Sequence, residues 1–85
     1  MLTQRSGSVL GMVGDVLVEH LGIDPAGLVG SARLAEDLGL DSIGLTEALL
    51  ALEDELAISI PEPVQADLAT LDDLVAAVGS RLGPA

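Results

Sequence analysis

The sequence contains no cysteine and a single histidine, His20. Without thiols there can be no disulfide bond, no cysteine nucleophile and no cysteine-ligated metal site. One histidine cannot form a metal-binding cluster, so no metal site is expected. Because a chain of 85 residues also supports only one domain with a modest core, a self-contained enzyme is the least favoured class of function.

Basic residues are scarce, since three Lys and Arg face fourteen Asp and Glu and the formal net charge is −11. Eleven of the acids, and no Lys or Arg, lie between Leu34 and Ser80. Nucleic acid and anionic membrane surfaces would repel such a chain, so neither is an expected partner. The expected partner is a protein with a basic surface patch.

Aromatic residues are absent, and so is any apolar run of about 20 residues that could span a membrane. The start of the chain does not have the pattern of a signal peptide, because residues 3–8 are polar or glycine and Asp15 interrupts the apolar stretch that follows. We therefore expect a cytoplasmic protein. Since 49% of the residues are apolar, the chain can form a core of Leu, Val, Ile and Ala.

Apolar residues at spacings of three and four predict three major helices. The first covers residues 8–21 and is stopped by Gly22. The second and clearest covers residues 42–56, and the last runs from residue 71 to about residue 82. The second helix carries one continuous leucine stripe, formed by Leu45, Leu49, Leu52 and Leu56.

The segments between these helices are shorter or irregular. Residues 22–40 form a long connection whose apolar side chains should hold it across the core, with room for a short helical turn. After Pro61, residues 62–68 can form one short helix, and Thr70 with Asp73 has the pattern of a capping box before the last helix. The predicted fold is all-α, a small four-helix bundle of three major helices and one short one. It forms a single domain over residues 1–85, with residues 1–7 and 83–85 frayed.

Asp41 and Ser42 stand at the start of the predicted second helix. Both residue types cap helix N-termini, so the pair has a purely structural interpretation. The position also suits a phosphate on Ser42, because a helix N-terminus offers free N–H groups and a partial positive charge. His20 belongs to another helix and cannot activate Ser42, so modification by a separate enzyme is the better functional interpretation.

The segment 34–43, Leu-Ala-Glu-Asp-Leu-Gly-Leu-Asp-Ser-Ile, resembles the signature of acyl carrier proteins. The resemblance continues through Glu47 and residues 51–56 to Ile60–Pro61, and it includes the helix lengths and the placement of Leu71. It covers nearly the whole chain and identifies it as similar to a free-standing carrier with an acyl-carrier-like bundle.

The resemblance implies that Ser42 bears a covalent 4′-phosphopantetheine arm, added from coenzyme A by a Mg-dependent phosphopantetheinyl transferase. Asp41 would assist this step by helping to hold a divalent cation. The thiol of the arm would hold acyl groups as thioesters for polyketide, fatty-acid-like or other specialised-metabolite biosynthesis. Such a protein is no enzyme but a monomeric substrate of acyl-loading and chain-processing enzymes, and its leucine-rich interior could part to shelter an acyl chain.

The outer face of the second helix is predicted to dock these enzymes. Two apolar side chains flanked by acids and a threonine recur there at helical spacing, opposite the leucine stripe. The resemblance implies that basic patches on the partner enzymes recognise this face, although scattered exposed apolar residues also occur without function. The residues of the predicted docking face are Ile43, Thr46, Glu47, Leu50 and Asp54.

Two residues have less specific interpretations. Gly44 stands where many fatty-acid carriers have an acidic residue, and this departure from the family weakens an assignment to fatty-acid synthesis and leaves specialised-metabolite pathways more open. It could allow close approach of the arm or a partner, or reflect a bent first helical turn. His20 is expected only to interact favourably with the dipole of the first helix.

Alternatives to an acyl carrier stay open at this point. A free-standing aminoacyl or peptidyl carrier of a nonribosomal peptide pathway would share the fold and the arm, but commonly has Gly-Gly where this chain has Gly39–Leu40. An acidic protein-interaction module without an arm would tolerate Ser42→Ala. A calcium loop is disfavoured, because Glu36, Asp37 and Asp41 do not have its ligand spacing.

Overall fold

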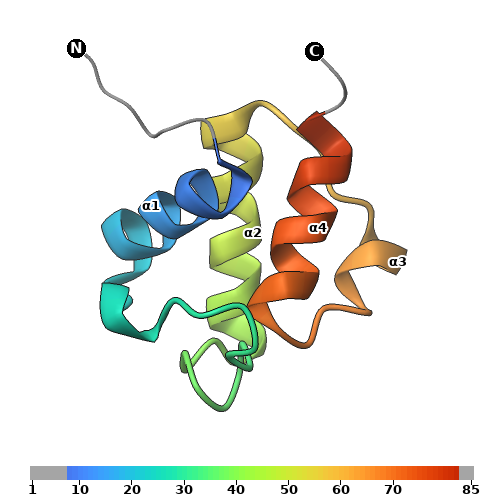
Figure 1. Cartoon of the computed structure of the whole chain (residues 1–85). Helices are drawn as coiled ribbons and strands as arrows, with labels where there is room; N and C mark the ends of the chain where they lie inside the picture. Colours follow the sequence, from blue (N-terminus) through green and yellow to red (C-terminus); the bar gives the residue numbers. More distant parts are fainter. Residues whose placement is uncertain (1–7, 83–85) are drawn as a thin grey trace, which may run out of the picture.

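A computed structural model describes residues 8–82 of the chain. It contains the helices α1 (Val9–Leu21), α2 (Ser42–Leu56), α3 (Glu62–Gln65) and α4 (Leu71–Leu82), with a short 3₁₀ helix, η1 (Pro25–Gly27), after α1 (Figure 1). The described residues form no β-strand beyond an isolated bridge between Arg33 and Thr70. The predicted bundle of three major helices and one short helix is confirmed. The predicted frayed ends, 1–7 and 83–85, lie outside the described residues.

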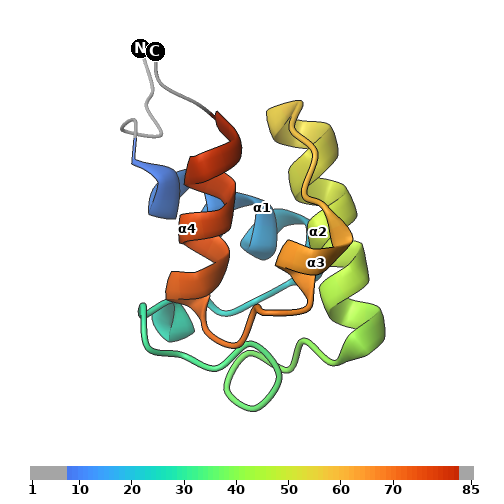
Figure 2. The same cartoon turned by 90° about the vertical axis from the view of Figure 1, so that its right-hand side faces the viewer.

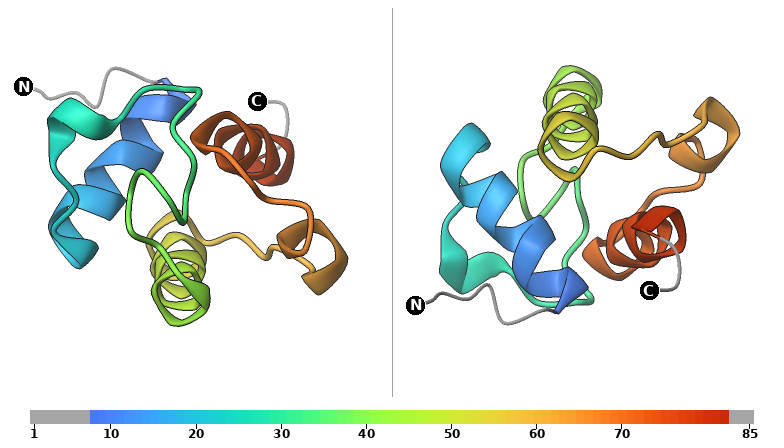
Figure 3. Two further views of the ribbon diagram at one scale, coloured as in Figure 1. Left: turned by 90° about the horizontal axis from the view of Figure 1, so that it is seen from below. Right: turned by 90° about the horizontal axis from the view of Figure 1, so that it is seen from above.

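Helix α1 crosses the bundle and packs against both α2 and α4. Figure 3 shows α2 and α4 almost end-on, with α1 lying across them. The short helix α3 lies on the side of the bundle away from α1 (Figure 2). The connection between α1 and α2 runs across the end of the bundle where α2 and α4 begin (Figure 1). This arrangement places the start of α2 at an edge of the molecule.

One hydrophobic core joins the three long helices and the connection before α2. Each helix buries the face that its apolar spacing predicts. Within residues 8–82 no polar or charged side chain is buried, so the acids of this region stay at the surface. None of the helices there has both the length and the apolar character needed to cross a bilayer. The helical side chains at the centre of the core are Val13, Leu17, Leu52, Leu71, Leu74 and Val78.

Local contacts end the helices near the predicted boundaries. Ser8 caps α1 through its hydroxyl, and Gly22 stops α1 in the left-handed conformation at φ 69°. The predicted capping box is present, because the Asp73 N–H donates to the Thr70 hydroxyl and the Thr70 N–H donates to the Asp73 carboxylate. The backbone N–H groups of Ala69 and Thr70 lower the pKa of the Asp73 carboxyl below its ordinary value of 3.8.

The long connection is ordered, as its apolar residues predict. The Leu34 N–H donates to the Ala69 carbonyl at 2.9 Å, and the Leu71 N–H donates to the Ala32 carbonyl at 2.8 Å. Leu34 is buried at 2% exposure and Leu40 at 4%. Backbone pairing with the segment before α4, together with these buried anchors, fixes the path by which the chain enters α2.

Two details differ from the sequence predictions. Regular helix covers only Glu62–Gln65 of the predicted segment 62–68, because i→i−3 hydrogen bonds from Asp67 and Leu68 tighten the rest into a turn. The expectation that His20 interacts only with its helix dipole is incomplete. Its Nε2 lies 3.5 Å from Oε2 of Glu55, at the end of α2, and only the packing of α1 across α2 brings the two together.

Candidate functional site

The first turn of α2 is built around Asp41, the N-cap residue of the helix. Its Oδ1 accepts a hydrogen bond from the Gly44 N–H at 2.9 Å. Its carbonyl accepts the first helical hydrogen bond, from the Leu45 N–H at 2.7 Å. Of the two candidate capping residues, Asp41 therefore makes the cap, and Ser42 is the first residue of the helix with no part in capping it.

The Ser42 side chain is exposed at the helix N-terminus. In residues 8–82 its hydroxyl forms no hydrogen bond, whereas its carbonyl accepts one from the Thr46 hydroxyl at 2.8 Å. The N–H groups of Ser42 and Ile43 have no acceptor within the helix, because they belong to its first turn. An anionic group on the Ser42 oxygen would therefore lie close to free N–H groups and the positive end of the helix dipole.

The residues before Asp41 hold this site in place. Gly39 adopts a positive φ of 71°, which side chains other than glycine rarely tolerate, and it turns the chain toward α2. The next residue, Leu40, is buried, and its N–H donates to the Leu34 carbonyl at 2.8 Å. Burial of Leu40 two positions before Ser42 anchors the exposed serine to the core.

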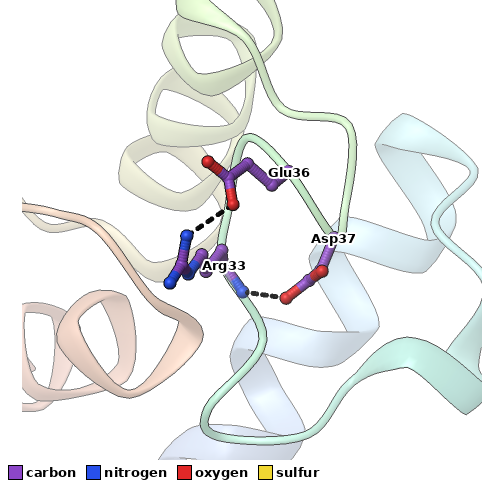
Figure 4. Close-up of polar contacts among 3 residues, drawn as sticks. All are labelled: Arg33, Glu36 and Asp37. Atoms are coloured by element: carbon purple, nitrogen blue, oxygen red, sulfur yellow. Dashed lines mark hydrogen bonds and ion pairs between the residues drawn. The ribbon is translucent and has the colours of Figure 1, made fainter.

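The acids just upstream of the site are engaged in a turn centred on Arg33 (Figure 4). The Arg33 guanidinium lies 2.6 Å from Oε1 of Glu36, and the Arg33 N–H donates to Oδ2 of Asp37 at 2.8 Å. Residues 8–82 contain no group of three or more His, Asp or Glu side chains that could hold a metal ion. Glu36 and Asp37 thus order the connection through their contacts with Arg33.

The predicted outer face of α2 is exposed along the whole helix. Ile43 is 72% exposed and Leu50 is 60% exposed, in contrast to the fully buried Leu52. The register predicted by the leucine stripe is therefore correct. Thr46, Glu47 and Asp54 are exposed with them, so the structure brings all five predicted docking residues to the surface of one helix.

A cavity of about 480 Å³ lies close to the start of α2. Leu40 and Leu45, on either side of Ser42 in the sequence, form part of its lining. The connection contributes Leu34, and the segment before α4 contributes Leu68, so the walls are largely apolar. The sequence analysis did not locate this cavity, because three segments far apart in the chain form it and none carries a local signal.

Gly44 and His20 can also be placed relative to Ser42. A Cβ on Gly44 would lie 3.4 Å from Oδ1 of Asp41, an ordinary contact, so crowding does not require a glycine there. A side chain there would lie against Asp41, Leu40 and Gly39, the residues that lead into the helix. His20 pairs with Glu55 at the opposite end of α2, roughly 20 Å along the helix from Ser42, so it cannot act as a base for the serine.

Comparison with known proteins links this arrangement to one family. The family described as "Phosphopantetheine attachment site" matches residues 13–78. The "Acyl carrier protein" of Phenylobacterium zucineum is 36% identical over 75 residues, which are 88% of this chain and 95% of that protein. The protein of the same name from Campylobacter concisus is 36% identical over 63 residues, 74% of this chain and 82% of the relative. The "Acyl carrier protein" of Rhodopseudomonas palustris is 38% identical over 61 residues, which are 72% of this chain and 77% of that protein.

Proposed function

Because the chain belongs to the acyl carrier protein family, whose covalent group is 4′-phosphopantetheine, we propose that it carries acyl intermediates as thioesters on an arm attached to Ser42. The observation that carries this proposal is the exposed Ser42 hydroxyl at the first position of α2. Like its relatives the chain is a carrier and not a catalyst, and we expect it to act as a cytoplasmic monomer. We infer a polyketide, fatty-acid-like or other specialised pathway, since no acid occupies the first turn of α2.

The residues around Ser42 fit a phosphopantetheine group. The hydroxyl is free to become the ester oxygen, and the N–H groups of Ser42 and Ile43 lie close to where its phosphate would sit. When bound, the arm would supply a terminal thiol for thioester formation, and the protein would supply the anchor and the surface that partner enzymes bind.

Asp41 is proposed to assist the phosphopantetheinyl transferase that installs the arm. Its Oδ1 is engaged with Gly44, but a carboxylate has further lone pairs with which to accept bonds or help to hold a divalent cation. The cap fixes the orientation of this carboxylate next to Ser42. Asp41 is thus proposed to act in two ways, by capping the helix and by placing a negative charge at the modification site.

The exposed face of α2 is proposed as the docking surface for the transferase and for acyl-loading and chain-processing enzymes. Ile43 and Leu50 would provide apolar contacts, while Glu47 and Asp54 would pair with Lys or Arg of the partner. Thr46 is tied to the Ser42 carbonyl, so it would contribute a fixed small surface. Placing the docking residues and the arm on one helix lets a bound enzyme reach the arm directly.

The cavity beside Leu40 and Leu45 is the proposed shelter for part of the cargo. Its volume of about 480 Å³ is within the range of small-molecule sites, and its walls are mostly Leu and Ala. The core has aliphatic side chains and no aromatic rings, so it can repack around an inserted acyl chain more easily than a core that contains rigid rings.

Intact mass spectrometry tests the attachment point. The full chain is incubated with coenzyme A, Mg²⁺ and a broad-specificity phosphopantetheinyl transferase, alongside Ser42→Ala and a control variant, Ser59→Ala. Ser59 is exposed in the segment after α2 and has no proposed role. We expect a gain of one phosphopantetheinyl group in the wild type and in Ser59→Ala, and none in Ser42→Ala.

Modification of Ser42→Ala would place the arm elsewhere. Absence of modification in the folded wild type, while a known carrier is modified in parallel, would contradict the carrier function and favour an acidic interaction module.

A further inference from the structure

Among residues 8–82, Arg33 is the one Lys or Arg that lines the cavity beside the start of α2. It lines this cavity of about 480 Å³ together with Glu36. Arg81, the other Lys or Arg of the described residues, belongs to the last turn of α4 and lies elsewhere. In a chain of net charge −11, the cavity close to Ser42 therefore has one of the few cationic side chains at its edge.

The backbone holds Arg33 at the cavity. An isolated antiparallel bridge pairs Arg33 with Thr70, and backbone hydrogen bonds of 2.9 and 2.8 Å join the neighbouring residues on either side of the bridge. Directly opposed residues of an antiparallel pair have their side chains on the same face, and both Arg33 and Thr70 line the cavity. The Arg33 N–H is also bound to Asp37. The position of the cation is thus fixed by the fold at its backbone.

Most hydrogen-bond donors of the Arg33 guanidinium are unused. A guanidinium has five N–H donors, and in residues 8–82 only Nη1 has a partner, Oε1 of Glu36 at 2.6 Å (Figure 4). Both side chains of this ion pair are exposed, so solvent screens it and it contributes little to stability. Nε and Nη2 can therefore donate to a group that enters the cavity.

The other walls of the cavity are largely apolar and include the side chains of Leu34, Leu40, Leu45 and Leu68. A pure hydrocarbon chain would fit these walls but would cover guanidinium donors without giving them an acceptor, which costs free energy. A chain with a keto or hydroxyl oxygen would supply that acceptor. A carboxylate fits less well, because Glu36 already places a negative charge there and the net charge of −11 repels a further anion.

Building on the carrier function proposed above, we propose that the cavity prefers acyl chains with an uncharged oxygen beyond the thioester carbonyl over plain hydrocarbon chains. The leucine walls hold the carbon chain, and the Arg33 guanidinium donates a hydrogen bond to the oxygen. Arg33 is thus a specificity-determining residue for the cargo. It lies outside α2, so it acts separately from the attachment point and from the proposed docking face.

Two cargoes of equal chain length test the proposal on the full chain. A broad-specificity transferase with Mg²⁺ loads Ser42 from hexanoyl- or 3-oxohexanoyl-coenzyme A, and intact mass confirms the loading. NMR contacts between the terminal methyl group of the chain and Leu34 or Leu68 measure the ratio of chains inside and outside the cavity. This ratio should be about fivefold higher for 3-oxohexanoyl, because its keto oxygen adds a hydrogen bond to a charged donor.

Three variants separate recognition of the oxygen from ordering of the connection. Arg33→Gln should remove the preference, with hexanoyl occupying the cavity as it does in the wild type. Glu36→Gln releases the guanidinium from its ion pair and should keep or increase the preference. Arg81→Gln is the matched control, because it removes the same charge away from the cavity, and it should change nothing.

Four results would overturn the proposal. Equal occupancy by the two cargoes in the loaded wild type would leave the carrier function intact and exclude cargo selection by Arg33. Equal losses in Arg33→Gln and Glu36→Gln, for both cargoes, would show that the ion pair only orders the connection. Higher occupancy by hexanedioyl, which ends in a carboxylate, than by 3-oxohexanoyl would make the cavity an anion site. Absence of loading at Ser42 would contradict the carrier function itself, and cargo selection with it.

Discussion

Oδ1 of Asp41 accepts a hydrogen bond from the Gly44 N–H at 2.9 Å, across the first turn of the helix that begins with Ser42. The residue next to the proposed attachment point therefore has a structural role that is independent of modification. A neutral side chain of the same shape could keep this hydrogen bond while it loses the charge. The two proposed roles of Asp41 can thus be separated by substitution.

Asp41→Asn should preserve the cap and slow modification, whereas Asp41→Ala should impair both. Asn caps helices about as well as Asp, so the free energy of unfolding of Asp41→Asn should stay within about 0.5 kcal/mol of the wild type. Asp41→Ala should lose about 1 kcal/mol of this free energy. Urea unfolding measures stability, and the initial rate of mass gain with transferase and coenzyme A measures modification. Equal modification rates for Asp41→Asn and wild type would show that the Asp41 charge has no part in installing the arm.

Glu47→Lys should reduce the kcat/KM of the transferase toward this carrier. The residue is exposed between Ile43 and Leu50 on the proposed docking face, where a basic partner would meet a repelling charge. Asp67→Lys is the matched control, because it is exposed outside α2 and changes the net charge equally, from −11 to −9. If both variants lost activity to the same extent, total charge and not the α2 face would govern recognition.

The sequence predicted the helices well where local signals define both ends. Helix α2 covers Ser42–Leu56 as predicted, because Asp41 begins it and the leucine stripe gives its buried face. Helix α4 begins at the capping box of Thr70 and Asp73, a contact within one turn of chain. The exposure of the candidate residues on α2 was predicted for the same reason, since helical spacing alone decides which side chains share a face.

Features that depend on how separate segments pack could not be predicted. The pairing of His20 with Glu55 needs α1 to cross α2, and no local pattern specifies that crossing. The cavity near Ser42 needs Leu34, Leu45 and Leu68 to come together. Helix α3 ends before the predicted residue 68, because the residues after Gln65 form a turn with i→i−3 hydrogen bonds. This turn brings Leu68 against the core.

Leu52→Ala should destabilise the protein strongly, and Leu50→Ala should not. Leu52 is fully buried at the centre of the core, so its truncation should cost about 2–5 kcal/mol. Leu50, two residues earlier, is 60% exposed, and its truncation should change stability by less than about 0.5 kcal/mol. Urea unfolding of both variants measures the difference, and similar losses would contradict the register of α2.

Asp73→Asn should weaken the dependence of stability on acidic pH. The pKa of Asp73 is lower in the folded protein than its ordinary value, so folding favours the charged form. That contribution is complete above pH 3.8 and is lost as the pH falls through the lower folded-state pKa. The wild type should therefore lose stability more steeply than Asp73→Asn below about pH 4.

Chemical unfolding at several acidic pH values measures both slopes. Asp72→Asn is the control, because it removes an equal charge from the same helical turn but leaves the capping box in place. If Asp72→Asn reduced the dependence of stability on pH as much as Asp73→Asn, the effect would come from the loss of one negative charge and not from the capping box.

Added salt should raise the melting temperature, because fourteen acids face only three Lys and Arg. No charged side chain in residues 8–82 is buried, so mobile ions can reach and screen the repelling groups. Raising the ionic strength from about 0.01 M to about 1 M shortens the screening length from about 30 Å to about 3 Å. A relief of about 1 kcal/mol would appear as a rise of roughly 4–8 °C, measured by circular dichroism.

The double variant Asp67→Asn/Asp72→Asn sharpens this test by lowering the net charge from −11 to −9 while changing only exposed side chains. If repulsion limits stability, the variant should melt at a higher temperature than the wild type in low salt and respond less to added salt. Salt also weakens attractive pairs such as Arg33 with Glu36, but that pair is exposed and contributes little. A melting temperature that does not change with salt in either protein would mean that the acids lie far enough apart for repulsion to be negligible.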